Sequence, residues 1–337
     1  MADAISSPPT VTVIVPVRDR AGMLRDLLES LLTQDYPASR MELIVVDGDS
    51  RDAIAEIVGE YARHAPFAVR YLQIGDDRGP VPKRNLGARN ANGEILAFTD
   101  SDCRTTPGWL SALVAPFRER DVAFCSGPVT YKPEQKKEFF SKLTAETLVE
   151  HPTYPTANVA YRRDLFLAAG GFAENLGIRD FLGRATECGD SDLAWRLKRE
   201  GHRNVFVPEA LILHEVEALT PFLWLMEPTR LILLPLLLKL HPEIGPRLLR
   251  WNLVFYPMTL VAYATFVMVP LLLILAPKAL PWLLAVGVVL LWLWKSRSLD
   301  PRRNWQVLQV AILHFLRLVV MAATLIAGSI RYGRLVL

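Results

Sequence analysis

Two carboxylates, Asp100 and Asp102, give the first chemical signal in the sequence. They directly follow Ile95 to Phe98, a short apolar run that predicts a buried strand, and one residue separates them. Residues two apart in an extended segment share a face, so both side chains point the same way. Two oxygen ligands placed in this way can hold Mg²⁺ or Mn²⁺, which in turn holds a diphosphate. An isolated Asp-x-Asp also fits a polar strand-to-loop exit, and the neighbouring segments decide between the two interpretations.

The segments around this pair alternate between strands and helices. Val11 to Val17 and Glu42 to Val46 predict buried strands, and Val69 to Gln73 predicts a third. Ala21 to Leu32 and Ala53 to Ala65 carry apolar residues at helical spacing. This order is typical of a parallel α/β sheet, in which ligands bind at the carboxyl ends of the strands.

A basic segment precedes the fourth strand. It begins as a Pro/Gly loop at Gly79 and predicts a helix over Pro82 to Asn90, with Lys83 and Arg84 in the first turn. The positive end of a helix dipole at this place favours a diphosphate. A solvated basic helix face, which would include Arg89, is the other interpretation.

Together these motifs resemble family 2 glycosyltransferases of the GT-A fold, a Rossmann-like α/β fold with a mostly parallel sheet. The resemblance covers about residues 10 to 214 and rests on four motifs in the family's order: Val13-Ile-Val-Pro-Val17, Glu42-Leu-Ile-Val-Val-Asp-Gly-Asp-Ser50, Arg84-Asn-Leu-Gly-Ala-Arg-Asn-Ala-Asn-Gly-Glu94 and Thr99-Asp-Ser-Asp-Cys103. Where many relatives have Tyr-Asn-Glu after the first strand, this chain has Arg18-Asp19-Arg20.

The resemblance implies a nucleotide-diphosphate sugar donor and a divalent metal, Mn²⁺ or Mg²⁺. The metal would be held by Asp100 and Asp102, with His214 as a further candidate ligand, although a single His after an apolar strand also fits a structural role. The implied donor-binding residues are Pro16, Val17, Arg18, Asp47, Asp49, Lys83, Arg84, Asp100 and Ser101.

A second acidic motif, Cys188-Gly-Asp-Ser-Asp192, opens a predicted helix that ends at Gly201. Asp190 falls at the start of this helix, where it could serve as an N-cap alone. The resemblance implies instead that Asp190 is the general base of an inverting transfer, with Gly189 in place of the family's Glu. We name Asn158 and Asp192 as candidates on the acceptor side.

The segment between these motifs and the bulk composition add further expectations. Val122 to Cys125 predicts a strand, and Phe139 to Glu150 predicts a helix. The net charge of +3 is too small to indicate a nucleic-acid partner. Three cysteines without a close pairing pattern indicate a reducing compartment and no disulfide framework. Residues 1–9 predict a disordered N-terminus without a signal peptide.

The composition changes after residue 218, where the predicted GT-A domain (residues 10–218) ends. Residues 219–250 are apolar but interrupted by Glu227, Pro228, Arg230 and Pro235, which favours an amphipathic segment at the bilayer surface or an ordinary docking helix. Residues 251–337 predict transmembrane helices at about 251–276, 279–294 and 305–330. Whether the third apolar segment crosses is left open.

Charges near these segments predict an orientation. The basic residues between Lys295 and Arg303 favour the cytoplasmic side, which would place the catalytic domain on the cytoplasmic face of the cell membrane. Arg317 lies inside the third apolar segment and either contacts an anionic lipid-linked acceptor or reaches towards a headgroup.

These observations predict a membrane-anchored, metal-dependent, inverting hexosyltransferase-like enzyme. Its acceptor would be a lipid, a lipid-linked sugar or a glycan, and single-sugar transfer is favoured because no Gln-x-x-Arg-Trp motif follows the base region. Two alternatives remain: a catalytically inactive GT-A membrane scaffold, and a nucleotidyltransferase acting on a sugar phosphate.

Overall fold

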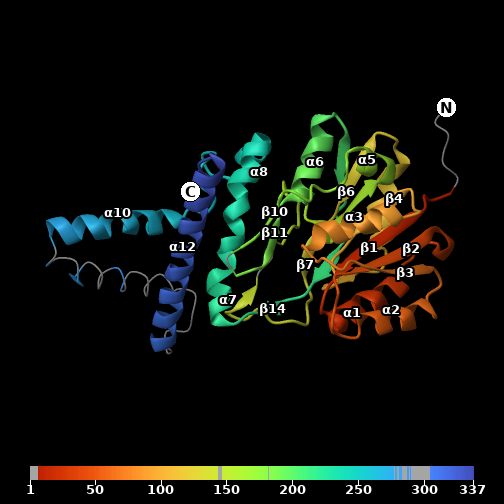
Figure 1. The fold of residues 1–337 in the computed structure, drawn as a ribbon, viewed down its shortest axis with the longest axis horizontal. Helices are drawn as coiled ribbons and strands as arrows, with labels where there is room; N and C mark the ends of the chain where they lie inside the picture. Colours follow the sequence, from red (N-terminus) through yellow and green to blue (C-terminus); the bar gives the residue numbers. More distant parts are fainter. Residues whose placement is uncertain are drawn as a thin grey trace. The chain divides into compact units, whose positions relative to one another are not determined.

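The computed structural model describes residues 7–142, 146–180, 182–276 and 304–337, with a few single positions between 278 and 289. The chain divides into two compact units, Met1–Glu217 and Ala218–Leu337 (Figure 1). Most of the expected disordered N-terminus, residues 1–6, lies outside the described residues. Pro9 is described, and its carbonyl accepts a hydrogen bond from the Tyr36 hydroxyl.

Within the described part of the first unit, the main sheet has seven strands in the order β12-β6-β9-β4-β1-β2-β3. β4, β1, β2 and β3 run parallel, β6 and β12 are parallel to each other, and β9 is antiparallel to both of its neighbours. This confirms the predicted mostly parallel sheet. The strands are β1 (Val11–Val17), β2 (Met41–Asp47), β3 (Ala68–Gln73), β4 (Ile95–Phe98), β6 (Val122–Ser126), β9 (Val159–Arg162) and β12 (Arg203–Phe206).

Helices cover both faces of this sheet (Figure 1). Leu24, Leu27 and Leu28 of α1 (Ala21–Leu32) pack with Val13 and Val15 on one face, where α2 (Ile54–Ala62) also lies. On the opposite face α3 (Pro80–Asn90) lies so close to β1 that a Cβ on Gly87 would meet Ile14 Cγ2 at 2.6 Å. Because strands β1 and β2 are buried over their whole lengths, their near-continuous apolar sequences are those of strands covered on both sides.

Shorter elements surround the sheet. β13 lies between β5 and β7 in a small second sheet, and β10 pairs with β11. Their bounds are β5 (Cys103–Thr105), β7 (Val129–Tyr131), β8 (Ser141–Lys142), β10 (Gly177–Arg179), β11 (Ala185–Glu187), β13 (Ile212–His214) and β14 (Glu217–Ala218). The remaining helices of this unit are η1 (Ala38–Arg40), α4 (Trp109–Val114), η2 (Ala115–Arg118), η3 (Thr156–Asn158), α5 (Arg163–Ala168) and α6 (Gly189–Arg199).

The helix predicted over Phe139 to Glu150 is wrong. Ser141 instead begins β8, and the Ser141 hydroxyl accepts a hydrogen bond from the Glu138 amide, which turns the chain. Thr147 pairs with Val129 in an isolated antiparallel bridge. Backbone pairing with distant strands therefore overrides the local helical pattern.

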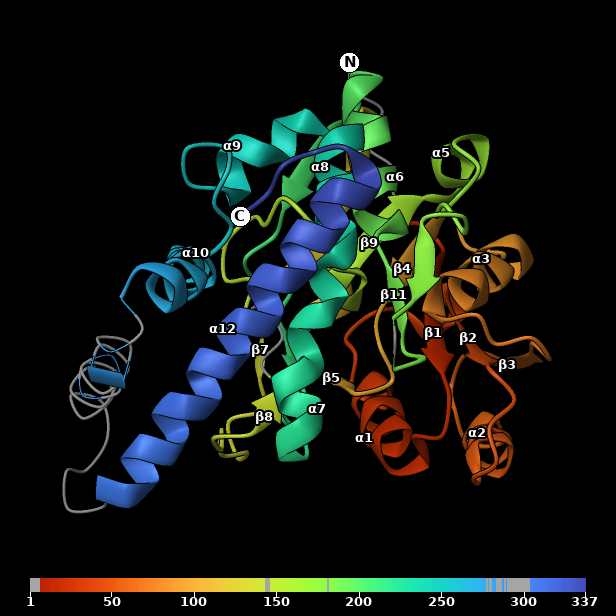
Figure 2. The same cartoon turned by 60° about the vertical axis from the view of Figure 1, so that its left-hand side comes forward.

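The second unit is helical in its described part. α12 runs along α7, η4 and α8, and it also contacts α10 (Figure 2). α12 approaches η4 closely at Gly328, where an added Cβ would lie 2.5 Å from the Ile232 carbonyl oxygen. The elements are α7 (Pro221–Met226), η4 (Glu227–Leu233), α8 (Leu234–Leu240), η5 (Pro242–Ile244), α9 (Gly245–Leu248), α10 (Thr259–Leu275) and α12 (Asn304–Tyr332).

Among the described residues, two helical segments are long and apolar enough to cross a membrane, Pro221–Leu240 and Gln309–Tyr332. The segment predicted as a spanning helix over 251–276 is helical only in α10, because the backbone turns at Trp251 and Asn252, each with φ 54°. The segment predicted at 279–294 and the basic residues from Lys295 to Arg303 lie outside the described residues, apart from positions 281, 282, 287 and 289.

Candidate active site

The carboxyl ends of β1 and β2 meet at one edge of the sheet. Pro16 and Val17 are the last two residues of β1, and the Gly48 amide donates to the Val17 carbonyl at 3.0 Å. Asp47 is buried and accepts hydrogen bonds from the Tyr71 hydroxyl at 2.6 Å and from Ser50. Asp49 is exposed in a left-handed turn. Of these two acids at the end of β2, only Asp49 is exposed to solvent.

Asp100 and Arg84 form the connection between β4 and α3. The buried guanidinium of Arg84 donates to Asp100 Oδ1 at 2.5 Å. Burial alone would raise the pKa of Asp100, but the charge and hydrogen bond of Arg84, together with the charges of His214 and Arg20, bring the pKa below its ordinary value. Asp100 is therefore ionised and can bind a cation, while Ser101 next to it is buried.

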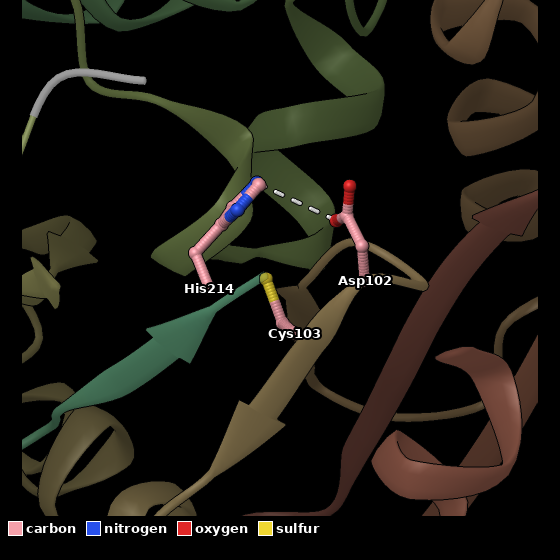
Figure 3. Close-up of side chains that lie close together, drawn as sticks. All are labelled: Asp102, Cys103 and His214. Atoms are coloured by element: carbon pink, nitrogen blue, oxygen red, sulfur yellow. Dashed lines mark ion pairs between the residues drawn. The ribbon is translucent and has the colours of Figure 1, made fainter. Parts of the chain in front are cut away.

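Asp102 lies beside His214 because of a strand register. β5 and β13 are antiparallel with Cys103 opposite His214, so the imidazole comes next to the residue preceding Cys103 (Figure 3). His214 Nε2 lies 3.5 Å from Asp102 Oδ1. The Glu215 amide also donates to the Asp102 carbonyl at 2.9 Å, which fixes the two segments together.

The residues present fit a divalent metal. Asp102 is 5% exposed, and its Oδ1 atom has no hydrogen-bond partner among the described residues, while Arg20 donates to Oδ2. One possible ligand atom from each of Asp102, Cys103 and His214 lies within 4.8 Å of the others. Carboxylate and imidazole suit Mn²⁺, whereas a thiol suits softer metals. Burial raises the pKa of Cys103 well above its ordinary value, so its thiol is protonated and a poor ligand.

A second cluster of charges lies at the start of α3. Asp77 accepts hydrogen bonds from Lys83 at 2.8 Å and from Arg18 at 2.8 Å. Burial lowers the pKa of Lys83, and its pairing with Asp77 opposes this change. Burial raises the pKa of Asp77, but the hydrogen bonds from Lys83 and Arg18 bring it below its ordinary value. Two of the predicted donor-binding cations are thus joined by one carboxylate.

Asp190 and Glu187 contribute two more carboxylates to the neighbourhood of Arg84. Asp190 lies in the first turn of α6, and burial raises its pKa while the charge of Arg84 lowers it. Burial raises the pKa of Glu187 to about 7, again opposed by Arg84. Asp100 and Asp190 also repel each other electrostatically. The structure therefore brings Arg84, Asp100, Asp190 and Glu187 into one group.

The remaining predicted site residues make other contacts. Asn158 is buried and bonds to the Trp109 indole at 2.9 Å and to the carbonyls of Pro128 and Ala210, so its amide serves the core. Asp192 accepts from Arg196 at 2.8 Å on α6. Arg317 belongs to the second unit.

Four residues of the site were missed by the sequence analysis as functional candidates: Arg20, Asp77, Cys103 and Glu187. Arg20 and Asp77 follow β1 and β3, so the rule that ligands bind at strand ends could have found them. Cys103 adjoins the Asp-Ser-Asp motif. Glu187 reaches the site through the β10–β11 pairing, for which the sequence carries no local signal.

The fold is that of a GT-A glycosyltransferase. A mannosyltransferase from Pyrobaculum calidifontis, solved in complex with GDP-Man and Mn²⁺, superposes with a TM-score of 0.63 over 97% of this chain and 88% of its own, at 22% identity. At this identity the likeness shows the fold alone.

Sequence comparisons show similarity to one enzyme family. The family model for glycosyl transferase family 2 matches residues 12–173. Glycosyltransferase AglE of Haloferax volcanii is 29% identical over 55% of this chain and 64% of its own length. The glucosyl-dolichyl phosphate glucuronosyltransferase of the same organism is 26% identical over 64% of this chain and 72% of its own. Residues 12–173 of this chain are therefore similar to glycosyl transferase family 2, and the chain spans less than two thirds of the length of the first relative.

Proposed function

We propose that this chain is an inverting glycosyltransferase that moves a sugar from a nucleotide-diphosphate donor to a lipid, lipid-linked or glycan acceptor at a membrane. The observation that supports this most strongly is the buried Oδ1 atom of Asp102, which has no hydrogen-bond partner among the described residues. It lies beside His214 Nε2, in the β4–β5 connection that also contains Asp100. A metal would occupy such a place, and a diphosphate would bind to that metal.

The chain's own cations would orient the donor. Arg84, Lys83 and Arg18 lie at or near the start of α3, where the helix dipole also favours an anion. A bound Mn²⁺ would neutralise the charge that develops on the departing nucleotide diphosphate. Asp100, Asp102 and His214 would hold that metal, and Arg84 would turn from Asp100 to a phosphate oxygen.

Asp190 would act as the general base. It takes the proton of the acceptor hydroxyl while that oxygen bonds to the anomeric carbon, and the bond from this carbon to the diphosphate oxygen breaks on the opposite face. A base must be deprotonated to act. Because burial raises the pKa of Asp190, we expect the rate to fall, as pH is lowered, at a higher pH than for an exposed Asp.

The membrane attachment belongs to this proposal as well. Pro221–Leu240 and Gln309–Tyr332 could each cross a bilayer by length and composition, and α10 is a shorter apolar helix. We propose that residues 219–250 lie at the bilayer surface, that later helices enter it, and that the catalytic unit faces the cytoplasm. The name of the glucuronosyltransferase relative supports a lipid-linked acceptor.

The test uses the full chain in detergent, a screen of GDP- and UDP-sugars with Mn²⁺ or Mg²⁺, and release of the nucleoside diphosphate as the readout. We expect Asp102→Asn to abolish metal-dependent nucleotide binding. Asp190→Asn should retain that binding but lower turnover by roughly 10²- to 10⁴-fold. Asp121→Asn, which changes an exposed carboxylate outside the site, is the matched control.

Two results would oppose the proposal. Metal-dependent nucleotide binding without any turnover would favour an inactive scaffold. Consumption of a nucleoside triphosphate and a sugar phosphate with release of pyrophosphate would favour a nucleotidyltransferase.

A further inference from the structure

The second unit places a guanidinium within an apolar helix. Arg317 lies on α12, within the segment Gln309–Tyr332 that is long and apolar enough to cross a membrane. It is eight residues after the first residue of that segment. At a rise of about 1.5 Å per residue, this is about 12 Å along the helix. A charged side chain at such a position is costly in hydrocarbon and typically marks a functional partner.

Trp224 of α7 holds this side chain in place. The Arg317 guanidinium carbon lies 4.5 Å from the centroid of the Trp224 ring, and Nη1 donates to the Trp224 carbonyl. The imidazole of His314 packs edge-on against the same indole, with ring centroids 5.1 Å apart. Arg317 and His314 are three residues apart and therefore lie on the same side of α12.

The charge of Arg317 is not matched by a neighbouring acid. Within the part of the chain that the structure describes, no carboxylate lies within 4.0 Å of its guanidinium, and Nε and Nη2 have no hydrogen-bond partner. Glu227 acts on it only through longer-range charge and pairs with Arg230 at 3.3 Å. Two donors of the guanidinium are thus available to an anion.

A cavity of about 250 Å³ opens beside these donors. Its wall combines apolar and aromatic side chains with the two nitrogen-bearing ones, and the lining residues are Phe255, Tyr256, His314, Arg317, Leu318 and Met321. Such a cavity offers an apolar surface for a hydrocarbon chain and a planar donor fork for an oxyanion.

We propose that this cavity binds the phosphate group of a lipid, with Arg317 on the phosphate and the apolar wall along the first part of the chain. A guanidinium matches two phosphate oxygens at once, whereas a free phosphate would leave the apolar wall uncovered. The site lies entirely within the second unit. The proposal is independent of glycosyl transfer and holds whether or not the bound lipid is the acceptor.

The test measures binding to the full chain in a maltoside detergent, which contains no phosphate. The three probes are dodecyl phosphate, dodecanol and inorganic phosphate, compared by equilibrium dialysis without nucleotide or metal. We expect saturable binding of one dodecyl phosphate per chain and at least roughly 10-fold weaker binding of the other two probes. This comparison uses the unchanged chain, so it does not depend on how any variant folds.

Variants then assign the site. Arg317→Gln should weaken dodecyl phosphate binding by at least roughly 10-fold, and Arg317→Lys should give an intermediate loss because the charge remains without the fork. Arg331→Gln removes an equal charge from an exposed position of the same helix and should change nothing. Circular dichroism and thermal unfolding check that each variant is folded.

Several outcomes would overturn the proposal. Equal binding of inorganic phosphate would indicate a site for a free anion, and equal binding of dodecanol would indicate an apolar pocket without phosphate recognition. An equal loss in Arg331→Gln would indicate general charge attraction to the detergent-bound chain.

Discussion

Arg84 Nη2 lies 2.5 Å from Asp100 Oδ1, a contact that joins the basic first turn of α3 to the acidic end of β4. Each group compensates the charge of the other while no substrate is bound. A metal–diphosphate complex would offer each residue a stronger partner. Asp100 could bind the cation, and Arg84 could bind the phosphate. Under the proposed function, the donor and its metal would replace this contact.

The first prediction concerns this pair. Arg84→Gln should weaken donor binding by about 1.5–3 kcal/mol, or roughly 10- to 150-fold, because a charge-assisted hydrogen bond to phosphate is lost. Arg89→Gln removes the same charge from an exposed position of the same helix and serves as the control. Titration of the nucleoside diphosphate with Mn²⁺ measures both. Similar losses in the two variants would mean that Arg84 contributes only general positive charge.

The second prediction concerns the metal. His214→Ala should lower Mn²⁺ affinity by roughly 10- to 100-fold or more, since an imidazole facing the orphaned Asp102 Oδ1 would be lost from the ligand set. His202→Ala, at a half-buried position paired with Glu200, is the matched control. Electron paramagnetic resonance of free Mn²⁺ gives the affinity. An unchanged affinity in His214→Ala would make this histidine a structural residue.

The third prediction is a pH dependence of stability from Glu187. Its pKa is about 7 in the folded chain against an ordinary 4.5, so the folded state binds the proton more tightly than the unfolded state. The resulting stabilisation is fully present below about pH 4.5 and is lost as pH rises through about 7. The free energy of unfolding should fall by at most about 3 kcal/mol over this range. Glu187→Gln should remove this decline, because the amide does not titrate.

Thermal unfolding between pH 5 and 8 measures this effect, with the wild-type chain and Glu187→Gln compared at each pH. The Gln side chain can still accept the hydrogen bond that the Val81 amide gives to Glu187 Oε2 at 3.1 Å. Glu174→Gln is the control, because Glu174 is a partly exposed acid that accepts a hydrogen bond from Asn85 of α3. Parallel pH curves for the wild-type chain and Glu187→Gln would contradict the raised pKa.

The elements that local periodicity specifies were predictable from the sequence. Val11 to Val17 and Ala21 to Leu32 lie as expected, since a near-continuous apolar run and a leucine stripe each depend on neighbours within a few residues. Asp100 and Asp102 could be located for the same reason, because they end a buried strand. The helix predicted over Phe139 to Glu150 failed because strand pairing there is with distant residues.

The assembly of the site was less predictable. His214 meets Asp102 through the β5–β13 register, which joins segments more than 100 residues apart. Glu187 reaches Val81 through a hairpin whose pairing no short motif indicates. Register and hairpin placement are decided by the packing of the whole unit, so a sequence without homologues shows the site's parts better than their contacts.

The last prediction concerns Gly79, the residue before α3. Its φ of 131° and ψ of −175° belong to a backbone region that only glycine adopts readily, and an added Cβ would lie 2.2 Å from Glu187 Oε1. Gly79→Ala should therefore destabilise the first unit by roughly 1–3 kcal/mol and displace the start of α3, weakening nucleotide binding with it. Gly75→Ala is the matched control, because no atom lies within 4 Å of its added Cβ. Thermal unfolding and Mn²⁺-dependent nucleotide titration measure the two effects, and equal behaviour of the two variants would show that the geometry of Gly79 does not position α3.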